Sequence, residues 1–131
     1  MYENPINLYD VACLQMHQET GIRFAGIINK SGRKIAGGFG PKVIPLEKDQ
    51  EKITMLMMEL ALDLTMRKEF NNSLGHMWAI VSYRENANII TIPHGENFML
   101  LSSEPGLDPV EIIQIAYHSL KPIKIMEVIA I

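Results

Sequence analysis

The sequence contains one cysteine, Cys13, so a framework of internal disulfide bonds is excluded. Chains without such bonds are typical of a reducing compartment, and we expect a cytoplasmic location. Long apolar runs are also missing, because the longest spans only a few residues, whereas a bilayer requires about 20. Residues 1–12 carry two acidic side chains and no basic one, which excludes the pattern of a secretory signal peptide. The sequence therefore predicts no membrane span and no leader.

An excess of positive charge is absent as well. The 12 Lys and Arg residues stand against 15 Asp and Glu residues, and the net charge of -3 argues against a dedicated nucleic-acid binder. Hydrophobic residues make up 47% and charged residues 21% of the chain, which excludes intrinsic disorder. A length of 131 residues predicts a single domain over residues 1–131.

Hydrophobic periodicity, glycine and proline predict the order of elements. The expected elements are a helix over residues 7–19, a hairpin of strands 21–29 and 33–39, a long helix over 46–70, strands 77–84, 88–93 and 97–103, and a helix that begins at Asp108-Pro109. This order, α-ββ-α-βββ-α, predicts an α+β fold in which hairpin-linked strands form antiparallel pairs and helices cover the two faces of the sheet. The tail, residues 121–131, is either an extra strand or an apolar segment docked on the core.

The long helix has two apolar stripes where a surface helix needs one. The stripe expected to face the sheet contains Ile53, Leu56, Met57, Leu60 and Leu64, and the second contains Met55, Met58, Leu62 and Met66. We therefore expect the second stripe to be buried against something other than its own sheet.

The stretch from Phe24 to Gly38 (FAGIINKSGRKIAGG) resembles the first hairpin of the Roadblock/LC7 family, within the wider profilin-like group. That hairpin joins an apolar strand, an Asp-x-x-Gly style turn and a strand with small residues, and Asn29 stands here where Asp is common. The element order over residues 7–120 is similar to that family. Three shorter stretches, residues 22–26, 36–39 and 82–85, are similar to a group of uncharacterised small archaeal proteins.

The resemblance implies a five-stranded antiparallel sheet, with the long helix on one face and the other two helices on the reverse. It also implies a homodimer in which the third strands pair at the sheet edge and the long helices pack together. Roadblock-like proteins commonly bind or regulate small GTPases, or scaffold larger assemblies, and they are not enzymes. The expected dimer-interface residues are Met55, Met58, Leu62, Met66, Trp78, Tyr83 and Arg84.

Residues 21–46 carry five basic side chains and no acidic one. A patch of one sign attracts partners of the opposite sign, so this segment predicts a docking surface for an acidic protein or a phosphate-bearing ligand. Its residues are Arg23, Lys30, Arg33, Lys34 and Lys42. The alternative is a solvated hairpin whose lysines protect the strand edge from aggregation.

The main hypothesis is a non-catalytic, homodimeric interaction module, with a small GTPase as one candidate partner. A small-molecule sensor is the first alternative, with a pocket lined by Phe24, Trp78, Phe98, Tyr117 and methionines. An enzyme is the second, and it requires a histidine beside a carboxylate or Cys13. Cys13 and His17 share a helix face, but structural zinc takes four ligands, so the sequence predicts no metal, cofactor or catalytic residue.

Overall fold

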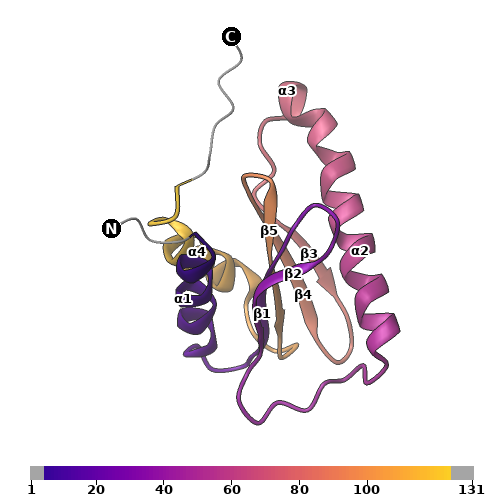
Figure 1. Cartoon of the computed structure of the whole chain (residues 1–131), viewed down its shortest axis with the longest axis vertical. Coiled ribbons are helices and arrows are strands. Elements are labelled where there is room, and N and C mark those ends of the chain that lie inside the picture. Colours follow the sequence, from indigo (N-terminus) through magenta and orange to yellow (C-terminus); the bar gives the residue numbers. More distant parts are fainter. Residues whose placement is uncertain (1–4, 125–131) are drawn as a thin grey trace.

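A computed structural model describes residues 5–124, and the side chains of residues 8–124. Three main helices and five strands of the described chain follow the expected order (Figure 1). Their bounds are α1 Pro5–His17, β1 Ile22–Ile28, β2 Lys34–Phe39, α2 Gln50–Arg67, β3 Ile80–Tyr83, β4 Asn88–His94, β5 Asn97–Ser103 and α4 Pro109–Leu120. A 3-10 turn, Lys68–Phe70, and the four-residue helix α3, Asn71–Leu74, continue α2.

The strands form one antiparallel sheet in the order β2-β1-β5-β4-β3. Helices α1 and α4 lie on one face and α2 lies on the other (Figure 1). The predicted α+β architecture is therefore confirmed. The strand order also places β3 at one edge of the sheet and β2 at the other, so each of these strands has one neighbour.

Capping side chains explain where two helices begin. Asp49 accepts a hydrogen bond from the Glu51 amide at 2.9 Å, and Asp108 accepts one from the Val110 amide at 3.0 Å. Each aspartate satisfies an amide that the helix itself leaves unpaired. The cap at Asp49 also corrects the expected start of the long helix at Leu46, because α2 begins at Gln50.

The turn between β1 and β2 follows from two residues. The Asn29 side chain accepts hydrogen bonds from the amides of Ser31 and Arg33, both at 3.0 Å. Gly32 has a φ of +81°, which is the left-handed region that favours glycine. A Cβ at Gly32 would lie 2.6 Å from the Met58 Cα, so this turn rests directly on the backbone of α2.

The main core lies between the sheet and the helices α1 and α4. Its completely buried members include Met16, Ile27, Ile92, Met99 and Leu101. Gly37 brings β2 close to α1, because a Cβ there would lie 2.8 Å from the Cys13 Sγ. This face of the sheet is closed by packed side chains.

The second core is small and lies under the C-terminal half of α2. It consists of Ile28, Ala61, Leu64 and Phe98. Lys68 strengthens the contact, since its Nζ donates to the Gly95 carbonyl at 3.0 Å and lies 5.2 Å from the centre of the Phe98 ring. Ala61 and Leu64 are the buried residues of α2. The helix is therefore anchored to the sheet at one end.

The third strand and the tail are the last two elements to compare with the sequence prediction. The third strand was expected over residues 77–84 but is regular only from Ile80 to Tyr83. The tail was predicted to be an extra strand or a docked apolar segment, and its residues 125–131 lie outside the described residues. Ile123 is buried against the α1 and α4 face, which places the start of the tail on that side.

Candidate interaction surfaces

The outer face of α2 carries a row of exposed apolar side chains. Met55, Met58, Leu62 and Met66 are each between 54% and 60% exposed. These residues form the second stripe predicted from the sequence, and we call them the outer row. Scattered apolar residues are normal on a protein surface, but a contiguous row on one helix indicates a contact surface.

The edge strand β3 contributes the remaining residues of the expected dimer interface. Tyr83 and Arg84, at its end, are exposed. Trp78 precedes the strand and packs edge-on against Tyr117 of α4, with ring centres 5.6 Å apart, and the Tyr117 hydroxyl donates to the Trp78 carbonyl. The structure therefore places Trp78 on the α4 side of the edge and the outer row on the α2 side.

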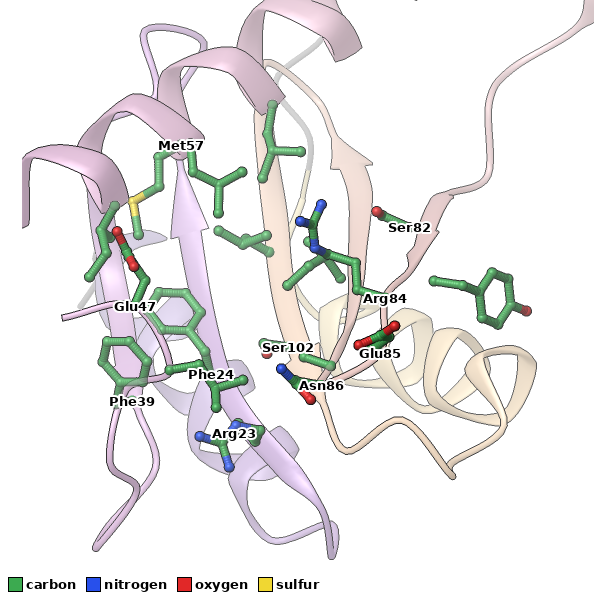
Figure 2. A pocket seen from close by; sticks show the side chains of 18 residues that line it. Arg23, Phe24, Phe39, Glu47, Met57, Ser82, Arg84, Glu85, Asn86 and Ser102 are labelled. Atoms are coloured by element: carbon green, nitrogen blue, oxygen red, sulfur yellow. The ribbon is translucent and has the colours of Figure 1, made fainter. Parts of the chain in front are cut away.

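A groove of about 830 Å³ lies between the N-terminal half of α2 and the sheet (Figure 2). Leu100, Phe24 and Ile89 from the sheet line one side, while Leu56 and Met57 are among the α2 residues that line the other. The buried residues of α2, Ala61 and Leu64, lie in its C-terminal half, and the groove lies along the other half. The sequence alone does not reveal this groove, because the apolar stripe of α2 gives no sign that only part of it packs on the sheet.

Two arginines line this groove, and they differ in whether their side chains have hydrogen-bond partners. Arg23 donates to the Glu104 carboxylate at 3.1 Å and to the Ile44 carbonyl at 2.8 Å. Within residues 8–124, Arg84 forms no side-chain hydrogen bond or ion pair with another side chain or with the backbone. Figure 2 shows its guanidinium extending toward α2, away from Glu85. Arg84 is therefore a cation available to a ligand or partner.

The five predicted partner-binding residues separate into two groups. Lys30, Arg33 and Lys34 lie at the β1–β2 turn, and Lys30 pairs with Glu96 at 3.4 Å. Arg23 and Lys42 lie at the other end of this strand pair, about six strand residues or roughly 20 Å away. The structure thus brings three of the five basic residues together.

A buried polar network joins α1 to the turn between β4 and β5. The Tyr9 hydroxyl donates to Nδ1 of His94 at 2.7 Å, and Nε2 of His94 donates to the Ile123 carbonyl at 3.2 Å. The Asn97 amide donates to the Tyr9 oxygen at 3.3 Å, so one neutral tautomer satisfies every partner. Burial lowers the pKa of His94, although the bond to Ile123 opposes the shift. The sequence pattern gave no signal for this network.

The remaining candidates for chemistry do not converge on a site. Burial raises the pKa of the Cys13 thiol to about 12, which makes it a poor nucleophile near neutral pH. In the described part of the chain, no histidine forms an ion pair with a carboxylate and no three metal-ligating side chains cluster. No helix within this part is long and apolar enough to span a bilayer.

The pocket expected for a sensor is composed differently from the prediction. Phe24 and Met57 line the groove, but Phe98 is completely buried in the small core. Trp78 and Tyr117 pack on each other outside the groove. The predicted pocket residues therefore belong to three different places in the fold.

Comparison with known proteins decides the family. The model for a family described as Family of unknown function (DUF6659) matches residues 1–126. The chain belongs to this family. No curated protein matches this DUF6659 sequence.

Solved structures show the fold of this DUF6659 member. A Roadblock/LC7 domain from Streptomyces avermitilis has a TM-score of 0.65 at 8% identity, covering 86% of this chain and 92% of that one. A structure described as MglB with tetrameric arrangement has a TM-score of 0.72 at 16% identity, covering 94% and 90%. A profilin from Schizosaccharomyces pombe has a TM-score of 0.55 at 13% identity, covering 88% and 92%. The fold is that of Roadblock/LC7 domains within the profilin-like group, as predicted.

Proposed function

We propose that the protein is a non-catalytic interaction module that acts as a homodimer. Two observations carry the proposal: the outer row of α2 is exposed, and the edge strand β3 has a free side. An exposed strand edge offers unpaired amides and carbonyls to a second chain, and an exposed apolar row on a helix offers apolar area for burial. A relative of the same fold, MglB, has been described in a tetrameric arrangement, which supports assembly of this type.

The partner surface proposed for this dimer is the β1–β2 turn. Gly32 of this turn rests on α2 at Met58, so the basic residues Lys30, Arg33 and Lys34 border the outer row. A small GTPase with an acidic face is the candidate partner that the family resemblance suggests. Complementary charge at such a border chiefly speeds association and selects the partner.

Light scattering tests the homodimer. The wild type is expected near twice 14.8 kDa. The double variant Met58→Glu/Leu62→Glu should be a folded monomer, because the two carboxylates would be buried without partners in the interface. Val11→Glu/Leu14→Glu is the matched control, since these two apolar residues of α1 are equally exposed on the opposite face. A monomeric wild type, or two double variants with the same mass, would contradict the proposal.

Fluorescence polarisation with purified small GTPases tests the partner surface. Reversing the charge with Arg33→Glu/Lys34→Glu should weaken binding and make it less dependent on salt. Lys42→Glu changes the charge at the other end of the strand pair and should leave binding unchanged. An equal loss in both variants would mean that net charge acts, and no surface at the turn would be assigned.

A further inference from the structure

The groove between α2 and the sheet has the properties of a ligand site. Its volume of about 830 Å³ lies within the roughly 300–1,000 Å³ of small-molecule pockets. Such pockets are mostly apolar with a few polar groups that fix the orientation of the ligand. The groove is formed by residues of one chain, although Tyr83 and Arg84 at its border are also expected at the dimer interface.

The walls of the groove are apolar on both sides. Phe24 and Leu100 are almost completely buried, and Phe24 packs edge-on against Phe39 with ring centres 5.0 Å apart. On the side of α2, Leu56 is 42% exposed although it belongs to the stripe that faces the sheet. An apolar molecule in the groove would cover this side chain without displacing any packed one.

The charged groups at the groove distinguish one kind of ligand. Arg23 is neutralised by Glu104, and Glu47 lies 4.0 Å from the ammonium of Lys52. Arg84 extends toward α2 with no acceptor among the described residues, while Glu85 points away from it (Figure 2). A guanidinium binds a carboxylate through two parallel hydrogen bonds, which makes it the natural partner for that group.

We propose that this groove binds a small amphipathic carboxylate. The apolar chain of the ligand lies between α2 and the sheet, against Phe24, Leu56 and Leu100, and its carboxylate pairs with Arg84. The ligand is a free molecule of this class. A second copy of the chain is a different occupant that the experiment must separate from it.

Methyl NMR of the methionines gives an internal control for this test. Met57 lines the groove, Met58 lies on the outer row, and Met99 is buried on the opposite face of the sheet. Sodium decanoate below its micelle concentration should shift the Met57 methyl signal and leave those of Met58 and Met99 in place. Decan-1-ol, which lacks the charge, should bind at least about tenfold more weakly, as expected for the loss of a charge-assisted hydrogen bond.

Two variants and one control sharpen the assignment. Arg84→Gln should weaken decanoate binding about tenfold and leave decan-1-ol binding unchanged, whereas Arg33→Gln, the same change in charge outside the groove, should alter neither. Leu56→Trp should fill the groove and abolish binding while the remaining NMR spectrum reports a folded chain.

Four results would overturn the proposal. Met57 could remain unshifted, or Met58 could shift in its place, which would put the ligand on the outer face of α2. Equal affinities for decanoate and decan-1-ol would remove the role of Arg84. A Met57 shift that appears on raising the protein concentration alone would make a second copy the occupant.

Discussion

The two faces of the sheet are built in opposite ways. On the face covered by α1 and α4, sixteen buried residues form one continuous core. On the face covered by α2, only Ile28, Ala61, Leu64 and Phe98 form a buried cluster. The α2 face also holds the groove, so part of its apolar surface is left without a packed partner.

The difference suggests that one face of the sheet stabilises the fold while the other leaves surface for binding. Packed apolar area supplies most of the free energy of folding, so the face of α1 and α4 holds the chain together. The face of α2 is held at one end, by Leu64 and Lys68, and its other end leaves apolar side chains uncovered. Side chains that folding does not bury remain available to a partner or ligand.

The largest expected effect compares one leucine from each face. Leu101→Ala, in the closed core, should lower the free energy of unfolding by about 2–5 kcal/mol, because it removes buried methyl groups and leaves a cavity. Leu56→Ala, at the open groove, should cost less than about 1 kcal/mol, since the residue is already 42% exposed. Urea unfolding measures both, and equal costs would show that the two faces contribute alike.

The second prediction concerns the glycine that separates the β1–β2 turn from α2. Gly32→Ala would place a Cβ 2.6 Å from the Met58 Cα, so either the turn or the helix must move. Gly75→Ala is the control, because Gly75 has a similar φ of +84° but nothing within 4 Å of the added atom. We expect Gly32→Ala to cost roughly 1–3 kcal/mol more than Gly75→Ala in urea unfolding. Equal costs would mean that the contact between turn and helix carries no strain.

The third prediction is a pH dependence that belongs to the closed face. His94 is neutral in the fold and its pKa is lowered mainly by burial, so the unfolded chain binds a proton more readily. The contribution of His94 to stability is complete above its ordinary pKa of 6.5 and falls as the pH drops below that value toward the lowered pKa of the fold. We expect this change in unfolding free energy to be smaller than the cost of the Leu101→Ala cavity, because only one group titrates.

His94→Asn isolates this contribution. Asparagine does not titrate in this range, so the slope of unfolding free energy between pH 6.5 and 5 should decrease in the variant, whatever its stability at pH 7.5. Urea unfolding at a series of pH values gives the slope directly. A wild-type slope that survives unchanged in His94→Asn would assign the pH dependence to other groups.

The sequence predicted the helices and strands well, but it did not predict the groove or the contacts between distant elements. Glycine, proline and the apolar period located all five strands and the start of the last helix at Asp108-Pro109, because these are local signals. The start of α2 was placed four residues early, since the charged residues after Leu46 fit a helix until Asp49 is seen to cap it. The groove and the Tyr9–His94 pair depend on distances between residues remote in sequence, and a local pattern carries no such information.

The smallest effect tests what holds α2 at its anchored end. Asp63 and Arg67 form an ion pair at 3.0 Å on the same half of the helix that buries Leu64. Because both side chains are about half exposed, the pair should add only about 0.3–0.5 kcal/mol in a double-mutant cycle of Asp63→Asn and Arg67→Gln. The coupling should shrink further at 1 M salt, where such charges are screened. A coupling above about 1.5 kcal/mol that resists salt would mean that charge, and not the burial of Ala61 and Leu64, fixes this end of the helix to the sheet.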